Sequence, residues 1–190
     1  MKSRKRPNAV FIDPFFCATL NPRRRASRAS SSRPITVAAR ACEIMSASAR
    51  DQECIAPLRA LGQPPQLLDA SGHLNFNELA ALLREAALYI GPDTSVSHLA
   101  AATGVPVIAI FGPTNPQRWA PWPANARTQA LFARSAAVQE EGNVTVLQGT
   151  QSCVPCGRAG CEDHRQSRSD CLQSITPQQV LAQVERILSQ

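Results

Sequence analysis

The sequence predicts an α/β domain with a doubly wound parallel sheet. Helical patterns and short apolar runs alternate over residues 66–111, in the order helix, strand, helix, strand. Residues 105–111 form one continuous apolar run, which is typical of a parallel strand that is buried on both faces. A glycine–proline pair stops each expected strand, at Gly91-Pro92 and at Gly112-Pro113. These observations indicate a Rossmann-like fold.

The first expected elements are a short apolar run at residues 66–69, a turn at 70–73 and a helix over 76–87. Asn75 precedes this helix and Glu78 follows three positions later, which is the spacing of a capping box. We expect the apolar residues that recur every three or four positions to share one helix face. These residues are Phe76, Leu79, Ala80, Leu83 and Ala87.

A short buried strand over residues 88–90 and a second helix over 96–103 come next. Thr94 or Ser95 is expected to cap this helix, and Gly104 is expected to end it.

The chain is expected to end in an amphipathic helix over residues 177–188, with Thr176 as its cap. The apolar side of that helix is predicted from the same three- and four-residue spacing. It comprises Val180, Leu181, Val184, Ile187 and Leu188.

The positive charge of the chain is concentrated near its N-terminus. The net charge is +6, but the arginine-rich first 50 residues hold only Asp13 and Glu43 as acidic side chains. We expect residues 1–35 to form a basic, disordered tail and residues 36–190 to form the domain. Nucleic acid and anionic lipid headgroups are alternative partners for such a tail. A short strand at 35–39 and a helix at 50–61 are also expected.

No apolar run approaches the roughly 20 residues that a membrane-spanning helix needs. The basic start of the chain is not followed by a long enough apolar stretch for a secretion signal. We therefore expect a cytoplasmic protein, with association at the cytoplasmic face of the inner membrane as an alternative.

The turn after the first strand carries the residues with the clearest chemistry. In open α/β sheets, ligands bind beyond the carboxyl ends of the strands. A helix that begins near Ser95 would direct free N–H groups and its positive dipole end toward this edge, which suits a diphosphate. Thr94 and Ser97 add hydroxyl groups, and His98 lies on the first turn. Taken alone, however, Asp93 and Thr94 could equally be a helix cap.

The whole stretch from Gly91 to Pro116, GPDTSVSHLAAATGVPVIAIFGPTNP, resembles glycosyltransferase family 9, the ADP-heptose:lipopolysaccharide heptosyltransferases. The similarity continues through Arg118-Trp119-Ala120-Pro121-Trp122-Pro123 and into the cysteine-bearing end of the chain, and it covers roughly residues 66–190. The resemblance implies the C-terminal, donor-binding half of a GT-B fold.

The resemblance also implies roles for particular residues. Asp93 would contact the heptose, and Thr94 with the N–H of Ser95 would hold the diphosphate. His98 would lie near the phosphates, and Leu74 would border the adenine pocket. The family usually has glycine where this chain has Ser95, whose side chain narrows the approach to the phosphate.

Two features of complete family members find no counterpart in the sequence. One is the N-terminal acceptor domain with its catalytic base, for which Asp13 is not a convincing candidate. The other is a lysine in a phosphate loop, since the only lysines are Lys2 and Lys5. The catalytic residue is therefore left unassigned, and turnover by this chain alone is left open.

Four of the seven cysteines fall near the end of the chain: Cys153, Cys156, Cys161 and Cys171. With His164 among them, they supply enough ligands for a structural zinc ion or an iron–sulfur cluster. The spacing after the first pair fits no standard zinc finger, so the alternatives are a loop of reduced thiols over residues 153–171 or one with an adventitious disulfide bridge. Catalysis itself is expected to require no cofactor.

Three functions follow from these observations. The first is the donor-binding half of an enzyme that transfers heptose from ADP-heptose to the inner core of lipopolysaccharide. The second is a non-catalytic remnant that at most binds nucleotide. The third is a metal-containing nucleic-acid-binding module, which the acidic balance of residues 51–190 disfavours.

Overall fold

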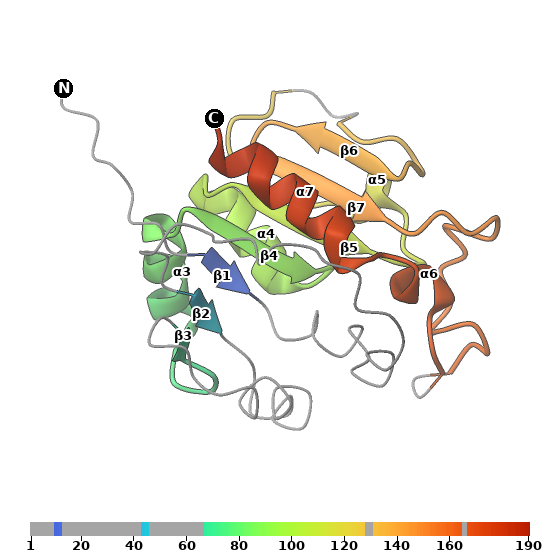
Figure 1. The fold of residues 1–190 in the computed structure, drawn as a ribbon, viewed down its shortest axis with the longest axis horizontal. Coiled ribbons are helices and arrows are strands. Elements are labelled where there is room, and N and C mark those ends of the chain that lie inside the picture. Colours follow the sequence, from blue (N-terminus) through green and yellow to red (C-terminus); the bar gives the residue numbers. More distant parts are fainter. Residues whose placement is uncertain (1–9, 13–42, 46–66, 128–130, 165–166) are drawn as a thin grey trace, which may run out of the picture.

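In the computed structural model, the structure describes residues 10–12, 43–45, 67–127, 131–164 and 167–190. The strand expected at 35–39 and the helix expected at 50–61 lie outside these ranges. The described strands form one seven-stranded sheet in the order β3-β2-β1-β4-β5-β7-β6 (Figure 1). The strands are β1 (Val10–Ile12), β2 (Glu43–Met45), β3 (Leu67–Asp69), β4 (Leu88–Pro92), β5 (Val107–Phe111), β6 (Val138–Glu141) and β7 (Val144–Gln148).

The order of the strands reverses at the centre of the sheet. The chain passes outward from β1 through β2 to β3 and then returns to place β4 on the other side of β1. All neighbouring strands are parallel except β6, which pairs antiparallel with β7 at one edge. The reversal between β1 and β4 is the topological switch point beside which ligands bind in doubly wound sheets.

Helices cover both faces of the sheet. Helices α3 and α4 lie on one face and α7 on the other (Figure 1). None of the helices in the described ranges is long and apolar enough to cross a membrane. The helices are α3 (Phe76–Glu85), α4 (Ser95–Thr103), α5 (Pro116–Trp119), α6 (Asp170–Gln173) and α7 (Pro177–Leu188).

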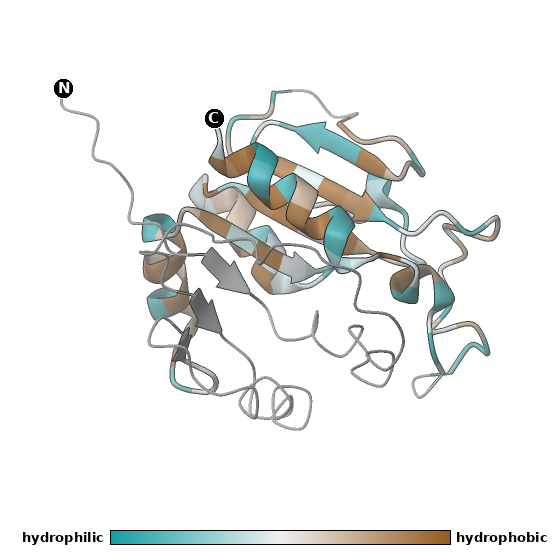
Figure 2. Ribbon diagram, in the orientation of Figure 1, coloured by the Kyte–Doolittle hydropathy of each residue, from teal (hydrophilic) through white to brown (hydrophobic). Residues whose placement is uncertain are grey.

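Side chains at alternate positions of the central strands pack into two separate hydrophobic cores. Tyr89 and Phe111 face the core beneath α3 and α4, whereas Ile90 and Ile108 face the core beneath α7. All of these side chains are buried, and Figure 2 shows β5 as an apolar strand at the centre of the domain. The predicted doubly wound architecture is confirmed, because a strand that is apolar on both faces needs a helical layer on each.

Helix α3 begins as the sequence predicts. The Asn75 side chain accepts hydrogen bonds from the N–H groups of Asn77 and Glu78, and the Glu78 carboxylate accepts one from the Asn75 N–H. The expected inward position of Phe76 is wrong, since its side chain is 58% exposed. Helical side chains lean toward the N-terminus, so a residue in the first position extends past the end of the helix instead of packing beneath it.

Helix α7 also has the predicted cap. Thr176 and Gln179 form a reciprocal capping box. Val180 is buried against the sheet, but Leu181 and Leu188, which were expected on the same side, are 38% and 44% exposed. The apolar face of α7 is therefore wider than the part of the helix surface that the sheet covers.

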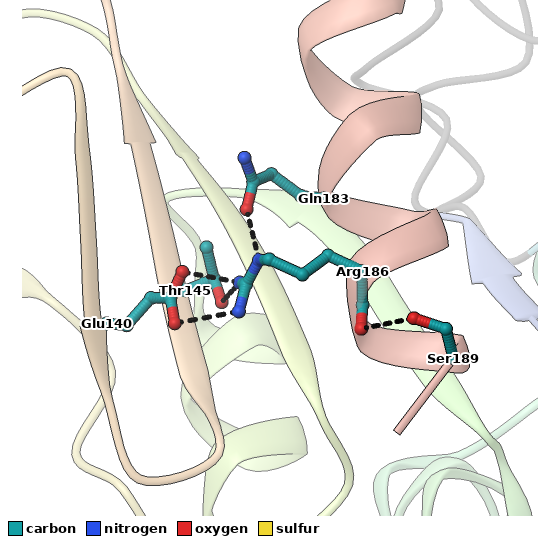
Figure 3. A network of polar contacts seen from close by, with 5 residues as sticks. All are labelled: Glu140, Thr145, Gln183, Arg186 and Ser189. Atoms are coloured by element: carbon teal, nitrogen blue, oxygen red, sulfur yellow. Dashed lines mark hydrogen bonds and ion pairs between the residues drawn. The ribbon is translucent and has the colours of Figure 1, made fainter.

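A polar network fixes the far end of α7 to the outer strands (Figure 3). The Arg186 guanidinium donates to Glu140 of β6, with one nitrogen–oxygen distance of 2.8 Å, and also to Thr145 of β7. Gln183 orients the guanidinium by accepting from its Nε. Because the pair is partly exposed, we expect it to set the position of the helix more than the stability of the fold.

Three parts of the sheet were not predicted from the sequence: β1, β2 and the β6–β7 hairpin. Strand β1 lies within residues 1–35, which were expected to be a tail, and it occupies the centre of the sheet between β2 and β4. The β6–β7 hairpin, over residues 138–148, completes the other edge. Three apolar residues carry too little periodicity to identify a strand whose only partners are distant in sequence.

The two apolar neighbours Val180 and Leu181 allow a test of how α7 packs. Val180→Ala should lower the free energy of unfolding by about 1–3 kcal/mol, because it removes buried methyl groups. Leu181→Ala removes more atoms but should cost less, since its side chain is partly in solvent. Urea unfolding of both variants measures the difference, and a larger loss for Leu181→Ala would show that α7 is rotated from the position described here.

Candidate functional site at the carboxyl end of β4

Strand β4, which leads into the site, is tightly packed at its carboxyl end. A Cβ atom on Gly91 would lie 2.1 Å from the Tyr89 hydroxyl oxygen, so only glycine fits beside the buried tyrosine. The backbone N–H of Asp93 continues the pairing of β4 with β5 by donating to the Ile110 carbonyl at 3.2 Å. The strand end is therefore held from beneath by Tyr89 and from the side by β5.

A buried serine then fixes the start of α4. The Ser97 side chain is completely buried, and its hydroxyl donates to the Pro92 carbonyl oxygen. The Tyr89 hydroxyl oxygen lies 3.3 Å from the same Ser97 oxygen. These contacts join the first turn of α4 to the last residue of β4, so the helix must begin directly above the carboxyl end of that strand.

Asp93 is the most perturbed ionisable group at this junction. Burial of its carboxyl group raises the pKa above the usual value of 3.8, while a hydrogen bond from the Thr114 side chain and the nearby His98 partly oppose that rise. Thr114 follows the neighbouring strand β5, so the two expected loops do meet at one place. A partly buried carboxylate at the rim of a site can accept hydrogen bonds from the hydroxyl groups of a ligand.

Thr94 occupies the cap position of α4, but its side chain does not act as the cap. In the described part of the chain, its hydroxyl oxygen is buried and has no hydrogen-bond partner. The first N–H groups of an α-helix have no partner within the helix. Of the two sequence interpretations, the geometry does not show a simple side-chain cap, and the first N–H groups of the helix are left open to a ligand.

The remaining predicted donor-binding residues lie along the same edge of the sheet. Ser95 and His98 are exposed on the first turn of α4, next to Asp93 and Thr94. Leu74 lies in the connection from β3 to α3, where it is partly buried against the core beneath α3 and α4. The structure thus brings four of the five residues together and places Leu74 beyond the end of another strand.

One residue that supports this site, Gln148, was not singled out from the sequence. The Gln148 amide donates to the Gly112 and Thr114 carbonyl oxygens at 3.2 and 2.8 Å, and the side chain is 3% exposed. Gln148 thereby holds the loop that presents Thr114 to Asp93. The glycine–proline turn after β5 marked this loop, but no local pattern marks Gln148, which ends a strand that was not predicted.

The four candidate metal ligands, Cys153, Cys156, Cys161 and Cys171, are all free thiols. They line one cavity of about 320 Å³, and burial raises the pKa of the Cys171 thiol. His164 is paired with Glu162 instead, at 3.0 Å. Within the described ranges, no three or more Cys, His, Asp and Glu side chains are arranged closely enough to hold a metal ion. The metal site therefore stays a prediction, and no chemical step is assigned to it.

The fold and the residues at its carboxyl edge define a Rossmann-like α/β domain with polar groups gathered at the end of β4. The sequence profile of glycosyltransferase family 9 (heptosyltransferase) matches residues 39–147. This match covers more than half of the chain, and the chain belongs to that family. The resemblance seen in the sequence is thereby confirmed.

Individual relatives match a shorter stretch of the chain or align with it at lower sequence identity. Lipopolysaccharide heptosyltransferase 3 from Escherichia coli is 36% identical over 90 residues, which are 46% of this chain and 26% of that protein. The structure of E. coli ADP-heptose lps heptosyltransferase II aligns with 99% of this chain at a TM-score of 0.60 and 15% identity. A family 9 glycosyltransferase from Veillonella parvula aligns at a TM-score of 0.57 and 17% identity.

The chain spans only part of these relatives. It covers about a quarter of the curated relative's length and 48% and 47% of the two solved chains. At this level of identity the solved structures establish the fold, and they confirm the predicted fold class.

The raised pKa of Asp93 predicts how the thermal stability of the domain depends on pH. A carboxyl group whose pKa is higher in the folded than in the unfolded chain stabilises the fold fully only at a pH below its unfolded pKa. This stabilisation is lost as the pH rises through the folded pKa. Asp93→Asn should therefore raise the melting temperature at pH 7, and the difference should shrink as pH falls below about 4. Thermal unfolding between pH 3 and pH 8 measures it.

Glu141→Gln is the matched control, because Glu141 is exposed on β6 and should show little change at either pH. A lower melting temperature for Asp93→Asn at pH 7 would contradict the assignment. It would mean that Thr114 and His98 stabilise the carboxylate by more than its burial costs.

Proposed function

We propose that this chain is the donor-binding half of a heptosyltransferase that moves heptose from ADP-heptose to the inner core of lipopolysaccharide. The observation that carries the proposal is the junction of β4 and α4. There, in a member of glycosyltransferase family 9, an open helix N-terminus lies beside a partly buried carboxylate. The buried Thr94 hydroxyl at the same place has no hydrogen-bond partner among the residues that the structure describes.

Comparison of the helix ends supports a ligand at this junction. Helices α3 and α7 are closed by the reciprocal side-chain caps at Asn75 and Thr176. Helix α4 has a threonine in the equivalent position, yet within the described residues that side chain makes no cap hydrogen bond. A diphosphate would satisfy the unpaired N–H groups, the Thr94 hydroxyl and the positive end of the helix dipole together.

The order of the strands supports one orientation of the nucleotide sugar in this proposal. Leu74 follows β3, whereas Thr94 follows β4 and Thr114 follows β5, so the three lie in sequence along the carboxyl edge. We place adenine near Leu74, the diphosphate at the start of α4 and the heptose beside Asp93 and Thr114. This arrangement takes the nucleotide across the switch point, as doubly wound sheets generally do.

The proposed chemistry follows from this orientation. When an acceptor hydroxyl attacks the anomeric carbon, with inversion, the bond to the diphosphate breaks and negative charge develops on the departing ADP. In this proposal the helix N–H groups and the Thr94 hydroxyl would lie where that charge develops, and His98 would donate to a phosphate oxygen. These groups need no cofactor. Asp93 would orient the sugar through its hydroxyl groups, and the base that activates the acceptor stays unassigned.

Isothermal titration of the full chain with ADP and with ADP-heptose tests the proposal. Both should bind, and Asp93→Ala should weaken ADP-heptose by about tenfold or more, because a hydrogen bond to a charged group contributes about 1.5–3 kcal/mol. The variant should affect ADP less, since ADP lacks the heptose. Glu141→Ala is the control, and absence of binding by the folded chain would contradict the proposal.

Turnover separates the enzyme from the non-catalytic remnant. ADP release from ADP-heptose in the presence of a lipopolysaccharide core acceptor would identify a complete enzyme. Donor binding without ADP release would identify a chain that holds the nucleotide sugar but needs a catalytic base from elsewhere.

A further inference from the structure

The loop that follows β5 is positioned through its backbone carbonyl groups. Three successive carbonyl oxygens in it each accept a hydrogen bond. The Gln148 side-chain amide donates to the carbonyls of Gly112 and Thr114 at 3.2 and 2.8 Å. The carbonyl between them, on Pro113, accepts from the Gly157 N–H at 2.8 Å. Two of these three anchors therefore depend on a single side-chain NH₂ group.

The side chain that supplies this group is buried at the end of β7. Gln148 is 3% exposed and lies beside Phe111 in the pairing of β7 with β5. Its amide nitrogen must face the loop, because carbonyl oxygens only accept and could not bond to the amide oxygen. That amide oxygen is buried without a hydrogen-bond partner in the ranges that the structure describes. An unpaired buried acceptor costs stability, so stability alone does not explain an amide at this position.

The anchored loop makes a direct contact with the proposed donor site. Strands β4 and β5 are parallel neighbours, so the loops that follow them meet. There the Thr114 side chain donates a hydrogen bond to the Asp93 carboxyl group and opposes the rise in its pKa. A carboxylate has acceptor sites on two oxygens. A bond from Thr114 limits its rotation and still leaves acceptor sites for the hydroxyl groups of a ligand.

We propose that Gln148 is a positioning residue for the sugar end of the donor. By holding two carbonyl groups of the loop, it keeps the Thr114 hydroxyl against Asp93, so that the carboxylate is oriented before the sugar binds. The effect on the sugar rests on the proposed function, whereas the coupling of Gln148 to Asp93 does not. A residue that acts through Asp93 affects the heptose and leaves the diphosphate at the start of α4 unchanged.

Isothermal titration of Gln148→Met with ADP-heptose and with ADP measures this selectivity. Methionine has a similar length but no N–H donor. We expect ADP-heptose to bind about threefold to tenfold more weakly, because one orienting hydrogen bond is lost, and ADP to bind almost as before. Gln139→Met is the matched control, since the Gln139 amide also donates to a backbone carbonyl, that of Ala133, but on the edge strand β6. Equal weakening of both ligands would overturn the proposal.

A double-mutant cycle with Thr114→Val tests whether Gln148 acts through the threonine hydroxyl. Each single variant should raise the pKa of Asp93, because the bond from Thr114 lowers it. The double variant should raise this pKa no further than Thr114→Val alone. NMR titration of the Asp93 carboxyl carbon in the free chain measures it. No rise in Gln148→Met, or a rise that adds to that of Thr114→Val, would contradict the coupling.

A measurement on the unsubstituted chain decides the matter if Gln148→Met does not fold. The NMR signal of the Gln148 side-chain amide should shift as Asp93 titrates and again when ADP-heptose is added. The side-chain amide of Gln139 should not respond to either. A Gln148 signal that ignores the titration of Asp93 would overturn the proposal.

The two proposals can fail separately. If neither ADP nor ADP-heptose binds, the donor site is refuted together with the role toward the sugar, and the pKa of Asp93 in the variants still decides whether Gln148 acts through Thr114. If both ligands bind and folded Gln148→Met weakens neither, the role of Gln148 is refuted and the donor site stands.

Discussion

The contact between the Ser97 hydroxyl and the end of β4 determines the geometry of the whole carboxyl edge. It requires a serine in the first turn of α4, a tyrosine beneath it and a glycine two residues after that tyrosine, since any side chain on Gly91 would collide with Tyr89. With these three residues in place, α4 can start only above the strand end. Its N–H groups then point away from the core toward the position where a ligand would lie.

The polar groups at this β4–α4 junction lower the stability of the fold. Asp93 is partly withdrawn from water, which raises its pKa, and the Thr94 hydroxyl is buried without a partner in the described residues. A side chain chosen only for stability would close the helix with a cap, as Asn75 and Thr176 do elsewhere in this domain. Polar groups that are left unsatisfied in a stable domain are typical of a site whose partner is a ligand.

Local signals predicted much of this domain. The caps at Asn75 and Thr176, the left-handed Gly104 and the apolar run of β5 each act within a few residues, so the sequence reveals them. Strand β1 and the anchoring role of Gln148 depend on partners far away in the chain. Phe76 and Leu181 show the limit of periodicity, which identifies an apolar stripe but not the part of it that the sheet covers.

The family resemblance supplied what local physics could not. From spacing alone, Asp93-Thr94 could equally have been a helix cap, and only the longer match pointed to a nucleotide sugar. The structure adds the Thr94 hydroxyl, which has no partner within the described ranges, and the link through Thr114 to Gln148, neither of which the sequence shows.

The central claim is that a diphosphate binds at the start of α4, and backbone amide NMR on ADP addition tests it most directly. The amides of Ser95 and Val96 should show the largest shifts, while those of Gln178 and Gln179 should stay unchanged because α7 is already capped. Equal shifts at both helix ends, or shifts confined to other parts of the chain, would contradict the claim.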